Sequence, residues 1–345
     1  MNNEKMHERI EKKNERTPLE TVVPLKSPYI MFIDPCGACN FKCQFCPCNN
    51  SDFKTEERHQ RMSLELFNKI VDDMQQFEEK VKVVNLYAFG EPLLNTSVPE
   101  MIRYLKEKDV CNEIRITTNG SCLSPELNQE LVDSGLDLLR ISVEAMSEAD
   151  YEMLCGVRID LDQYIENIKD LYQKSRGKMK VAVKIVNSMI RNEQDEQLFF
   201  DTYGEYADYI FRQNVDDTWS EFSIGEVAKN NKRYWEGETA INCITEDERC
   251  SYPLISMVVH SNGLVSACCA DWKFATVYGD ANNTSVYDIW NSDKLRQFQI
   301  GHMELGREVT HFCSKCTLKA FDNVDDVADI IAARLKGESD CAVKR

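Results

Sequence analysis

The chain has 345 residues, 43% of them hydrophobic and 29% charged, which is ordinary for a globular protein and enough for roughly two domains. Its net charge of −17 at pH 7 argues against a nucleic-acid partner, because phosphate-binding surfaces are basic patches and none is visible. No apolar run approaches the length that spans a bilayer, so we expect no membrane partner either.

Fifteen cysteines would suggest a disulfide framework in a small secreted protein. This chain is long, however, and its charged first eight residues contain no apolar signal segment. We therefore expect a cytoplasmic protein that keeps its thiols reduced for metal binding.

Apolar runs and helical segments alternate along the first two thirds of the chain. Residues 1–27 are dense in charged and amide side chains and predict a solvated arm or partial helix outside the core. Short apolar runs then predict buried strands at 29–33, 83–89, 113–118, 138–143, 181–186 and 209–212. Helices are predicted from Ser63, from a capping box of Ser97 and Glu100, from Ser124-Pro125, and around 147–175 and 193–206.

Six strands that alternate with helices predict parallel β/α units, and so an α/β fold: a partial (β/α)6 TIM-like barrel. In such folds the functional loops gather at the carboxyl ends of the strands. A cysteine-rich loop, a Gly-Glu-Pro sequence and an Asn-Gly turn follow the first, second and third predicted strand. We expect all three motifs at one end of the barrel.

The last third of the chain has a different character. Residues 214–242 show no clear periodicity and are interpreted as a linker or cap, whereas cysteine pairs, glycine turns and short strands follow from residue 243. A closing helix is predicted over 323–335, with a frayed tail after it. The predicted division is a charged arm (1–27), a barrel (28–225), a linker with a small cysteine-rich domain (226–322), and a helix with tail (323–345).

Cys39, Cys43 and Cys46 form the strongest motif. Their intervals of four and three, with the aromatic Phe45 before the third thiol, fit three corners of an iron–sulfur cubane and leave its fourth iron without a protein ligand. Zinc is the alternative, because Cys36-x2-Cys39 and Cys43-x2-Cys46 could be two zinc knuckles. Only three residues separate those pairs, however, and structural zinc sites usually have a longer insert.

Together with Gly-Glu-Pro at 90–92, the triplet resembles the radical S-adenosylmethionine (SAM) superfamily, over most of residues 29–320. The resemblance implies a 4Fe–4S cluster whose open iron binds SAM, with Phe45 beside the cofactor. It also implies an electron donor such as flavodoxin or ferredoxin. One electron from the cluster cleaves SAM to methionine and a 5'-deoxyadenosyl radical, which abstracts hydrogen from a small-molecule substrate.

Five further residues match positions that surround SAM in this superfamily: Gly90, Glu91, Pro92, Asn119 and Ser142. The usual loop is Gly-Gly-Glu-Pro, and this chain has Phe89 in place of the first glycine. The last two matches also fit an ordinary Asn-Gly turn and an ordinary polar strand end.

The second motif consists of one glycine and four cysteines: Cys250, Gly263, Cys268, Cys313 and Cys316. It resembles the SPASM extension, but Asp322 stands where a further cysteine would be needed. The resemblance therefore implies the truncated "twitch" form, with one auxiliary 4Fe–4S cluster held by four thiolates. The intervals of 18, 45 and 3 between the cysteines are similar to those of 2-deoxy-scyllo-inosamine dehydrogenase, the aminocyclitol dehydrogenase of butirosin biosynthesis.

Other ligands and another metal also fit the second motif. A four-thiolate zinc ribbon uses the same side chains. Cys269 could replace Cys268, and Cys243 could replace Cys250.

The resemblance implies a radical SAM oxidoreductase or epimerase that acts on a sugar or an aminocyclitol. Dehydrogenation would use the auxiliary cluster in electron transfer, whereas epimerisation would take hydrogen from a thiol. Candidate catalytic residues are Cys48, Cys155 and Glu144. Two alternatives stay open. One is modification of a ribosomal peptide, for which the 27-residue arm is short, and the other is a non-enzymatic zinc or iron–sulfur scaffold.

Overall fold

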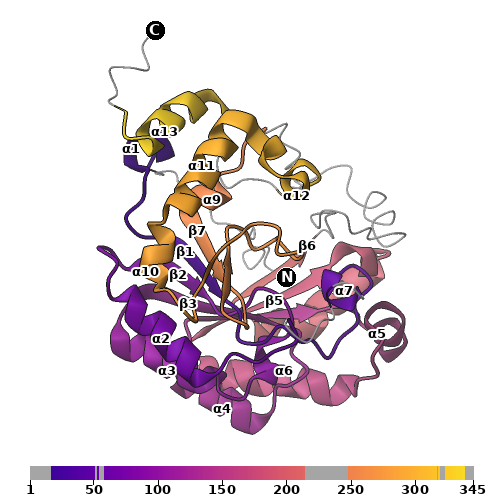
Figure 1. Cartoon of the computed structure of the whole chain (residues 1–345). Helices are drawn as coiled ribbons and strands as arrows, with labels where there is room; N and C mark the ends of the chain where they lie inside the picture. Colours follow the sequence, from indigo (N-terminus) through magenta and orange to yellow (C-terminus); the bar gives the residue numbers. More distant parts are fainter. Residues whose placement is uncertain are drawn as a thin grey trace.

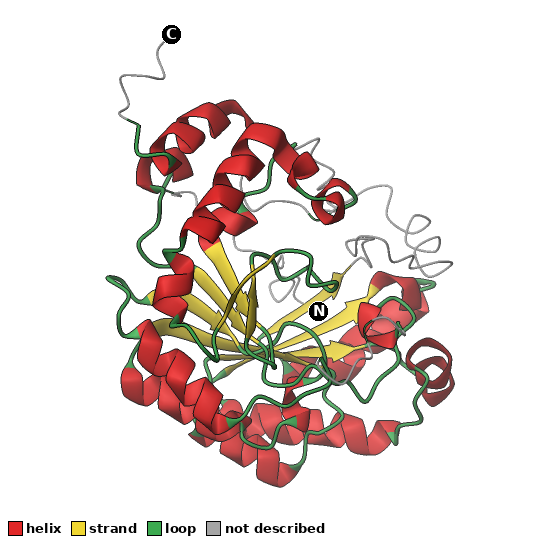
Figure 2. Cartoon of the chain, in the orientation of Figure 1, coloured by secondary structure: helices red, strands yellow, loops and turns green. Residues whose placement is uncertain are grey.

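The computed structural model of the protein describes residues 17–50, 53, 58–213, 248–316, 318 and 323–338. Its strands form one nine-stranded sheet in the order β6-β5-β4-β3-β2-β1-β7-β8-β9 (Figures 1 and 2). The strands are β1 (Ile30–Ile33), β2 (Val81–Asn85), β3 (Cys111–Thr118), β4 (Leu138–Val143), β5 (Lys180–Val186), β6 (Tyr209–Gln213), β7 (Ser256–Val259), β8 (Leu264–Ser266) and β9 (Val277–Asp280).

Strands β1 to β6 are parallel and lie side by side in chain order, as the alternation of strands and helices predicted. The predicted α/β fold, a partial TIM-like barrel followed by a small cysteine-rich domain, is confirmed. The predicted second strand is shifted, because β2 ends at Asn85 and the chain from Leu86 to Phe89 forms a loop. That loop carries the Gly-Glu-Pro sequence to the carboxyl end of the sheet.

The parallel strands are connected by helices: α2 (Leu64–Met74), α3 (Val98–Lys108), α4 (Pro125–Asp133), α5 (Glu148–Cys155), α6 (Leu161–Ser175) and α7 (Glu193–Tyr203). In Figure 1, α2, α3, α4 and α6 lie below the sheet, and α5 and α7 lie to its right. Ser63 Oγ accepts a hydrogen bond from Leu66 N at 3.1 Å and so caps α2. The capping box predicted at Ser97 is wrong, because the Ser97 side chain makes no capping bond. Asn95 Oδ1 accepts from Ser97 N instead.

The cysteine-rich segment extends the barrel sheet. Strand β7 pairs in parallel with β1, and β8 and β9 follow as antiparallel neighbours. The remaining helices belong to this half: α9 (Tyr252–Ile255), α10 (Val286–Trp290), α11 (Asp293–Leu305), α12 (His311–Ser314) and α13 (Ala328–Leu335). The segments that contain the two cysteine groups are therefore joined through one hydrogen-bonded sheet. The predicted linker at 214–242 and the predicted boundary at 225 lie outside the described residues.

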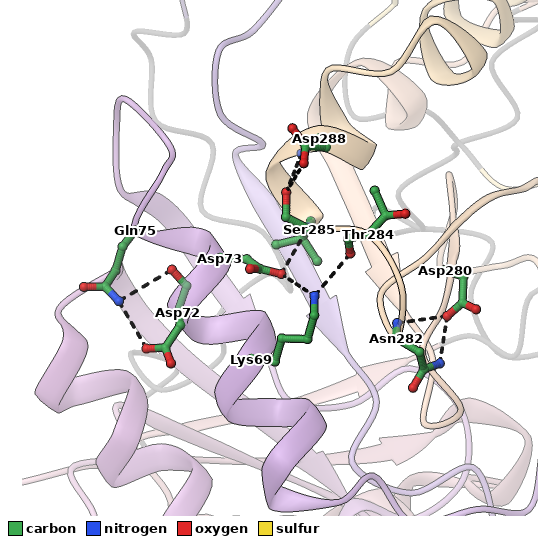
Figure 3. Close-up of polar contacts among 10 residues, drawn as sticks. Lys69, Asp72, Asp73, Gln75, Asp280, Asn282, Thr284, Ser285 and Asp288 are labelled. Atoms are coloured by element: carbon green, nitrogen blue, oxygen red, sulfur yellow. Dashed lines mark hydrogen bonds and ion pairs between the residues drawn. The ribbon is translucent and has the colours of Figure 1, made fainter.

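Hydrogen bonds also fasten the C-terminal half to helix α2 (Figure 3). Lys69 Nζ donates to the Thr284 carbonyl oxygen at 3.3 Å, and Val286 N donates to Asp73 Oδ2 at 3.3 Å. Lys69 and Asp73 form a 2.9 Å ion pair with each other. These contacts fix the start of α10 against the barrel.

The part of the predicted arm that the structure describes is packed into the protein, which corrects the expectation that it lies outside the core. Helix α1 (Leu19–Val22) begins with buried Leu19, and Val23 and Leu25 are buried after it. Arg334 on α13 donates to the Val23 carbonyl oxygen at 2.9 Å. These apolar side chains are buried although they are scattered among charged residues and form no periodic apolar pattern in the sequence.

Short 3-10 turns complete the described structure, at Pro47–Asn49, Pro92–Leu94, Asn187–Met189, Gly204–Tyr206, Gly306–Val309 and Asp325–Val327. No helix among the described residues is both long enough and apolar enough to cross a membrane.

Candidate active site

The first cysteine group lies in the loop after β1. Cys39, Cys43 and Cys46 are partly exposed, and the Cys46 thiol is close enough to the other two for their charges to interact. Burial raises the pKa of Cys39 to about 12, so metal binding there requires loss of a proton. The three predicted ligands therefore lie together at the carboxyl end of the first strand.

The Gly-Glu-Pro loop after β2 is fastened to this cysteine loop. Glu91 N donates to the Ala38 carbonyl oxygen at 2.8 Å, and Gly90 N donates to Cys48 Sγ at 3.3 Å. Gly90 has a φ of +62°, and a Cβ at this position would lie 2.2 Å from the carbonyl oxygen of Cys36. Only glycine fits this close approach of two loops.

The carboxylate of Glu91 joins the same loop to the end of β3. It accepts hydrogen bonds from Thr118 Oγ1 at 2.6 Å, Asn119 N at 2.7 Å and Leu93 N at 3.1 Å. Burial raises the pKa of Glu91 to about 7, against the effect of these donors. Pro92 follows in a 3-10 turn and is buried. Both carboxylate oxygens are engaged within the protein, so this side chain orders the site.

Asn119 and Ser142 lie at the ends of neighbouring strands. Asn119 Nδ2 donates to Asn40 Oδ1 at 2.9 Å and lies 3.9 Å from Cys39 Sγ, so it contacts the cysteine loop directly. Ser142 is buried on β4, where the register pairs it with Lys184 of β5. The structure thus brings both residues to the same end of the barrel as the cysteine loop.

The two predicted catalytic thiols are buried beside the first cysteine group. Cys48 hydrogen-bonds to Cys46 and Cys155 hydrogen-bonds to Cys43, and both side chains are buried. Phe45 is half-buried and packs on the main core. Cys48 and Cys155 therefore support the loop from within.

Glu144, the third catalytic candidate, directly follows β4. Its side chain is buried, and it makes no hydrogen bond or ion pair with the residues that the structure describes. Burial raises the pKa of the Glu144 carboxyl, and the nearby charge of Lys184 opposes that rise. The charge of Glu144 acts on both Cys43 and Cys46, so Glu144 lies beside the first cysteine group.

The second cysteine group lines a cavity of about 20 Å³. The four predicted ligands reach it from the start of α9, the end of β8 and the region of α12: Cys250, Cys268, Cys313 and Cys316. Phe298, Phe312 and Leu318 cover it with apolar surface, and its polar lining includes His302 and Arg307. Burial raises the pKa values of Cys250, Cys313 and Cys316. The pKa of Cys268 is raised by its hydrogen bond with Cys269 and then by burial.

Gly263 explains the spacing of this group, because it forms the turn between β7 and β8. It has a φ of +88°, and a Cβ there would lie 2.2 Å from Asn282 Nδ2. The turn sends β8 toward Cys268, which lines the cavity, whereas Cys269 does not. Cys243 lies outside the described residues.

A small apolar cluster lies between the two cysteine groups. Its buried members are Cys48, Phe53, Phe89, Trp272 and Phe312, and it packs against Cys39 and Cys46 of the first group and Cys313 of the second. Phe89 fills the place of the usual first glycine and packs on Phe53 at a ring distance of 5.4 Å. Both groups of thiols therefore border one apolar cluster.

Asp34 was not identified from the sequence, although it connects the first two strand ends. It directly follows β1, and the backbones of Cys36, Ala88 and Phe89 hydrogen-bond to its carboxylate. Burial raises the pKa of Asp34 to about 8. An acidic residue immediately after an apolar run was the available signal.

His260 was missed as well. It follows β7, its ring stacks on Phe89 at 6.0 Å, and it lies 4.1 Å from the ring of Phe274. His260 Nε2 is hydrogen-bonded to Ser266 Oγ at 2.8 Å, and burial lowers the pKa of the histidine to about 3. A neutral histidine thus belongs to the packing between the two cysteine groups.

Within the part of the chain that the structure describes, no three His, Cys, Asp or Glu side chains are arranged to hold a single metal ion. The thirteen cysteines that it describes are free thiols.

Comparison with known sequences assigns each cysteine group to a family. Residues 33–199 match the sequence model of the radical SAM superfamily, and residues 250–317 match that of the iron–sulfur cluster-binding domain SPASM. The resemblance predicted from the sequence is thereby confirmed, and the two domains imply 4Fe–4S clusters and SAM as cofactors.

A probable GTP 3',8-cyclase of Methanococcus maripaludis is 33% identical over 138 residues, which are 40% of this chain and 42% of that protein. The chain thus spans less than half of this relative. BtrN, crystallised with AdoMet and 2-DOIA, has a TM-score of 0.55 and 18% identity, covering 86% of this chain and 97% of BtrN. Streptococcus suis SuiB bound to precursor peptide SuiA has a TM-score of 0.60 and 18% identity, covering 80% of this chain and 67% of SuiB. At these identities the two structures share the fold alone.

Proposed function

Because the chain is a radical SAM protein with a C-terminal SPASM domain, we propose that it dehydrogenates a small sugar or cyclitol substrate. When bound, SAM and the cluster at the first cysteine group would supply a hydrogen-abstracting 5'-deoxyadenosyl radical, and a cluster at the second group would supply an electron acceptor. A secondary alcohol becomes a ketone when its carbon loses one hydrogen atom to that radical, its hydroxyl loses a proton and one electron leaves.

The proposed ligands of the SAM-binding cluster are Cys39, Cys43 and Cys46. They fit the group because their thiols lie together at one strand end, on a loop that backbone hydrogen bonds fasten to the Gly-Glu-Pro loop. The Gly90–Pro92 backbone, Asn119 and Ser142 would contact SAM, since all of them surround the same end of the barrel.

Cys250, Cys268, Cys313 and Cys316 are proposed to hold the auxiliary cluster. They fit because all four thiols line one cavity whose other walls are largely apolar. Four thiolates leave no open metal position for a substrate, so the chemistry suited to this group is electron transfer.

The observation that carries the dehydrogenase proposal is the apolar cluster shared by the two cysteine groups. Phe89, Trp272 and Phe312 pack between Cys39 and Cys46 on one side and Cys313 on the other. An electron acceptor at the second group would therefore stand close to the place where the substrate radical forms. An epimerase needs a thiol that the substrate can reach, and the two candidate thiols, Cys48 and Cys155, are buried.

Glu144 is proposed as the base that takes the hydroxyl proton. It is a buried carboxylate at a strand end beside the first cysteine group, and the described residues give it no hydrogen-bond donor. A carboxyl whose pKa is raised by burial is a better proton acceptor than an exposed one. A reducing cytoplasm with flavodoxin or ferredoxin as electron donor suits thiols that must stay free.

The test is anaerobic reconstitution followed by metal analysis and a SAM cleavage assay with dithionite. The proposal expects about eight irons per chain and release of 5'-deoxyadenosine. About four irons with one zinc would keep the radical step but remove the electron acceptor, and so contradict dehydrogenation. Zinc alone with intact SAM would leave a structural scaffold.

Modification of a peptide is the second candidate function, and the similarity to SuiB in complex with its precursor peptide supports it. A peptide substrate would be bound by a groove that accepts an extended chain. Turnover of a sugar with no leader peptide present would decide against it.

A further inference from the structure

Strands β1 to β6 carry six cationic side chains. Lys82 and Lys180 lie among the first two residues of their strands, and four others lie nearer the active-site end: Arg115, Arg140, Lys184 and Arg212. Their direction follows from the alternation of side chains along a strand. Leu139, Ile141 and Val143 of β4 are buried in the main core that contains the helix side chains. Arg140 therefore lies on the opposite, inner face of β4, the face that also carries Ser142.

Three of these cations have a partner within the protein. Arg115 forms a 2.6 Å ion pair with Glu113, and Arg212 forms a 2.7 Å ion pair with Glu196. Lys184 Nζ donates to Gln213 Oε1 at 3.0 Å. The positive charge at these three positions is thus offset or hydrogen-bonded before any substrate binds.

Arg140 differs from the other three. Its guanidinium makes one long hydrogen bond, from Nη1 to Thr117 Oγ1 at 3.5 Å, and it pairs with no carboxylate among the described residues. Arg140 Nε is shielded from solvent and has no hydrogen-bond acceptor. Removing a cation from water without a partner is costly. It is also unexpected in a chain with 58 acidic and 41 basic residues, where carboxylates are plentiful.

The neighbours of Arg140 fit a hydroxylated, negatively charged ligand. The register places Arg140 between Thr117 of β3 and Ala182 of β5, and Ser142 pairs with Lys184 one step nearer the active-site end. This inner face therefore offers a small residue beside the arginine, two hydroxyl groups and a second cation. Guanidinium groups bind phosphate oxygens through paired, charge-assisted hydrogen bonds.

We propose that Arg140 binds an oxyanion of the substrate, and that the substrate is a sugar phosphate. This inference rests on the proposed function and narrows its substrate class. An aminocyclitol or amino sugar carries a positive charge at neutral pH, which Arg140 would repel. The charge of Lys184 is opposed by the nearby Glu144 carboxylate, so the preference depends on Arg140. The inner face therefore selects a phosphorylated sugar over the amine-bearing alternative.

The test compares three ligands that differ mainly in charge: glucose 1-phosphate, glucose and glucosamine. Their affinities for the reconstituted protein with SAM bound are measured by isothermal titration calorimetry. We expect glucose 1-phosphate to bind about tenfold or more tightly than glucose, as for charge-assisted hydrogen bonds, and glucosamine to bind most weakly. Arg140→Gln should abolish the preference for the phosphate, and Arg140→Lys should retain part of it.

Arg103→Gln is the matched control, because it removes one positive charge from an exposed position on α3. It should leave the preference unchanged. The iron content of Arg140→Gln should equal that of the wild type, which establishes that the variant is folded and holds its clusters. Arg140→Lys provides the comparison if the glutamine variant loads poorly.

Two results would overturn the proposal. One is a wild-type protein that binds glucose 1-phosphate no better than glucose or glucosamine. The other is an Arg140→Gln variant whose affinity for SAM falls while its phosphate preference persists, because the arginine would then bind the SAM carboxylate. A protein that keeps an Arg140-dependent phosphate preference but does not cleave SAM would refute the proposed function and leave this inference standing.

Discussion

The two cysteine groups are built in opposite ways. Cys39, Cys43 and Cys46 come from one loop of eight residues, which hydrogen bonds from the Gly-Glu-Pro loop and from Asn119 hold in place. The second group comes from segments spread over 67 residues, from Cys250 to Cys316, and its thiols meet only because β7 and β8 extend the sheet from β1. The first group is therefore set by local loop geometry, and the second by the fold of the whole C-terminal half.

This difference predicts unequal consequences when one thiol is removed from each group. Cys39→Ala should abolish 5'-deoxyadenosine formation and leave about half of the iron, because the auxiliary ligands are intact. Cys268→Ala should also lose about half of the iron but still release 5'-deoxyadenosine. Iron analysis and product chromatography distinguish the two variants. Release of 5'-deoxyadenosine by Cys39→Ala would break the assignment of the first group.

The contact between the two loops of the first group gives the next largest effect. Gly90→Ala would place a Cβ 2.2 Å from the Cys36 carbonyl oxygen, so the cysteine loop must move. We expect most iron of the first group to be lost, with the second group unaffected. Gly177→Ala is the control, since Gly177 also has a positive φ of +74° but has open space around it.

That control should cost only about 1 kcal/mol of folding stability and leave the iron content unchanged. Equal iron loss in both glycine variants would show that backbone strain, rather than contact between the loops, governs the first group.

The apolar cluster between the groups tests whether they depend on each other. Phe89→Ala should lower the free energy of unfolding by about 3 kcal/mol, as is usual when a buried phenylalanine is truncated. It should also alter the electron paramagnetic resonance signals of both clusters, because Phe89 belongs to the packing that contacts Cys39, Cys46 and Cys313.

Phe77→Ala is the matched control, because Phe77 is also buried but packs on Tyr287 at a ring distance of 5.9 Å. Denaturant unfolding should show a similar loss of stability, and the spectra should be those of the wild type. Unchanged spectra in Phe89→Ala would mean that the two groups are independent despite their common border.

The sequence was sufficient to predict the barrel and the first group, because the relevant signals are local. Apolar runs predicted the six parallel strands, and the motifs lay directly after them, so their meeting at one end followed from topology. The hydrogen-bond partners of Glu91 on β3 could not be predicted, since they depend on how closely two strand ends approach. The sequence did not predict that both cysteine groups follow strands of one sheet. The pairing of β1 with β7 depends on both strands, and neither strand's sequence alone indicates it.

Asp34 and Arg140 were missed for a related reason. A carboxylate after a strand and an arginine within one look like ordinary polar residues in a sequence. Their significance lies in what surrounds them. Three backbone groups hydrogen-bond to the buried acid, and the half-buried arginine forms no ion pair with a carboxylate among the described residues. Such properties are set by packing across strands, whereas the thiol motifs are set by spacing along the chain.

Replacing Asp34 has the smallest predicted effect and tests the loop that holds the first cysteine group. Burial raises the pKa of its carboxyl from 3.8 to about 8, so the folded protein holds a proton that the unfolded chain has already released at neutral pH. The stability contributed by this proton is full below pH 3.8, decreases as the pH rises above that value, and is lost once the pH has passed the folded pKa.

Between pH 7 and pH 9, a single group with a folded pKa of about 8 lowers the free energy of unfolding by about 1.4 kcal/mol. The Asp34→Asn side chain cannot titrate and has nearly the same shape. From pH 7 to pH 9, the free energy of unfolding of this variant should therefore decrease by about 1.4 kcal/mol less than that of the wild type. Urea unfolding of the metal-free wild type and variant at pH 7 and pH 9 measures this difference in pH dependence. The titration of the thiols contributes equally to both proteins and cancels. Equal pH dependence in the two proteins would mean that Asp34 stays ionised in the folded state. The first strand end would then be held by a charged carboxylate, and the order of the cysteine loop would rest on that charge.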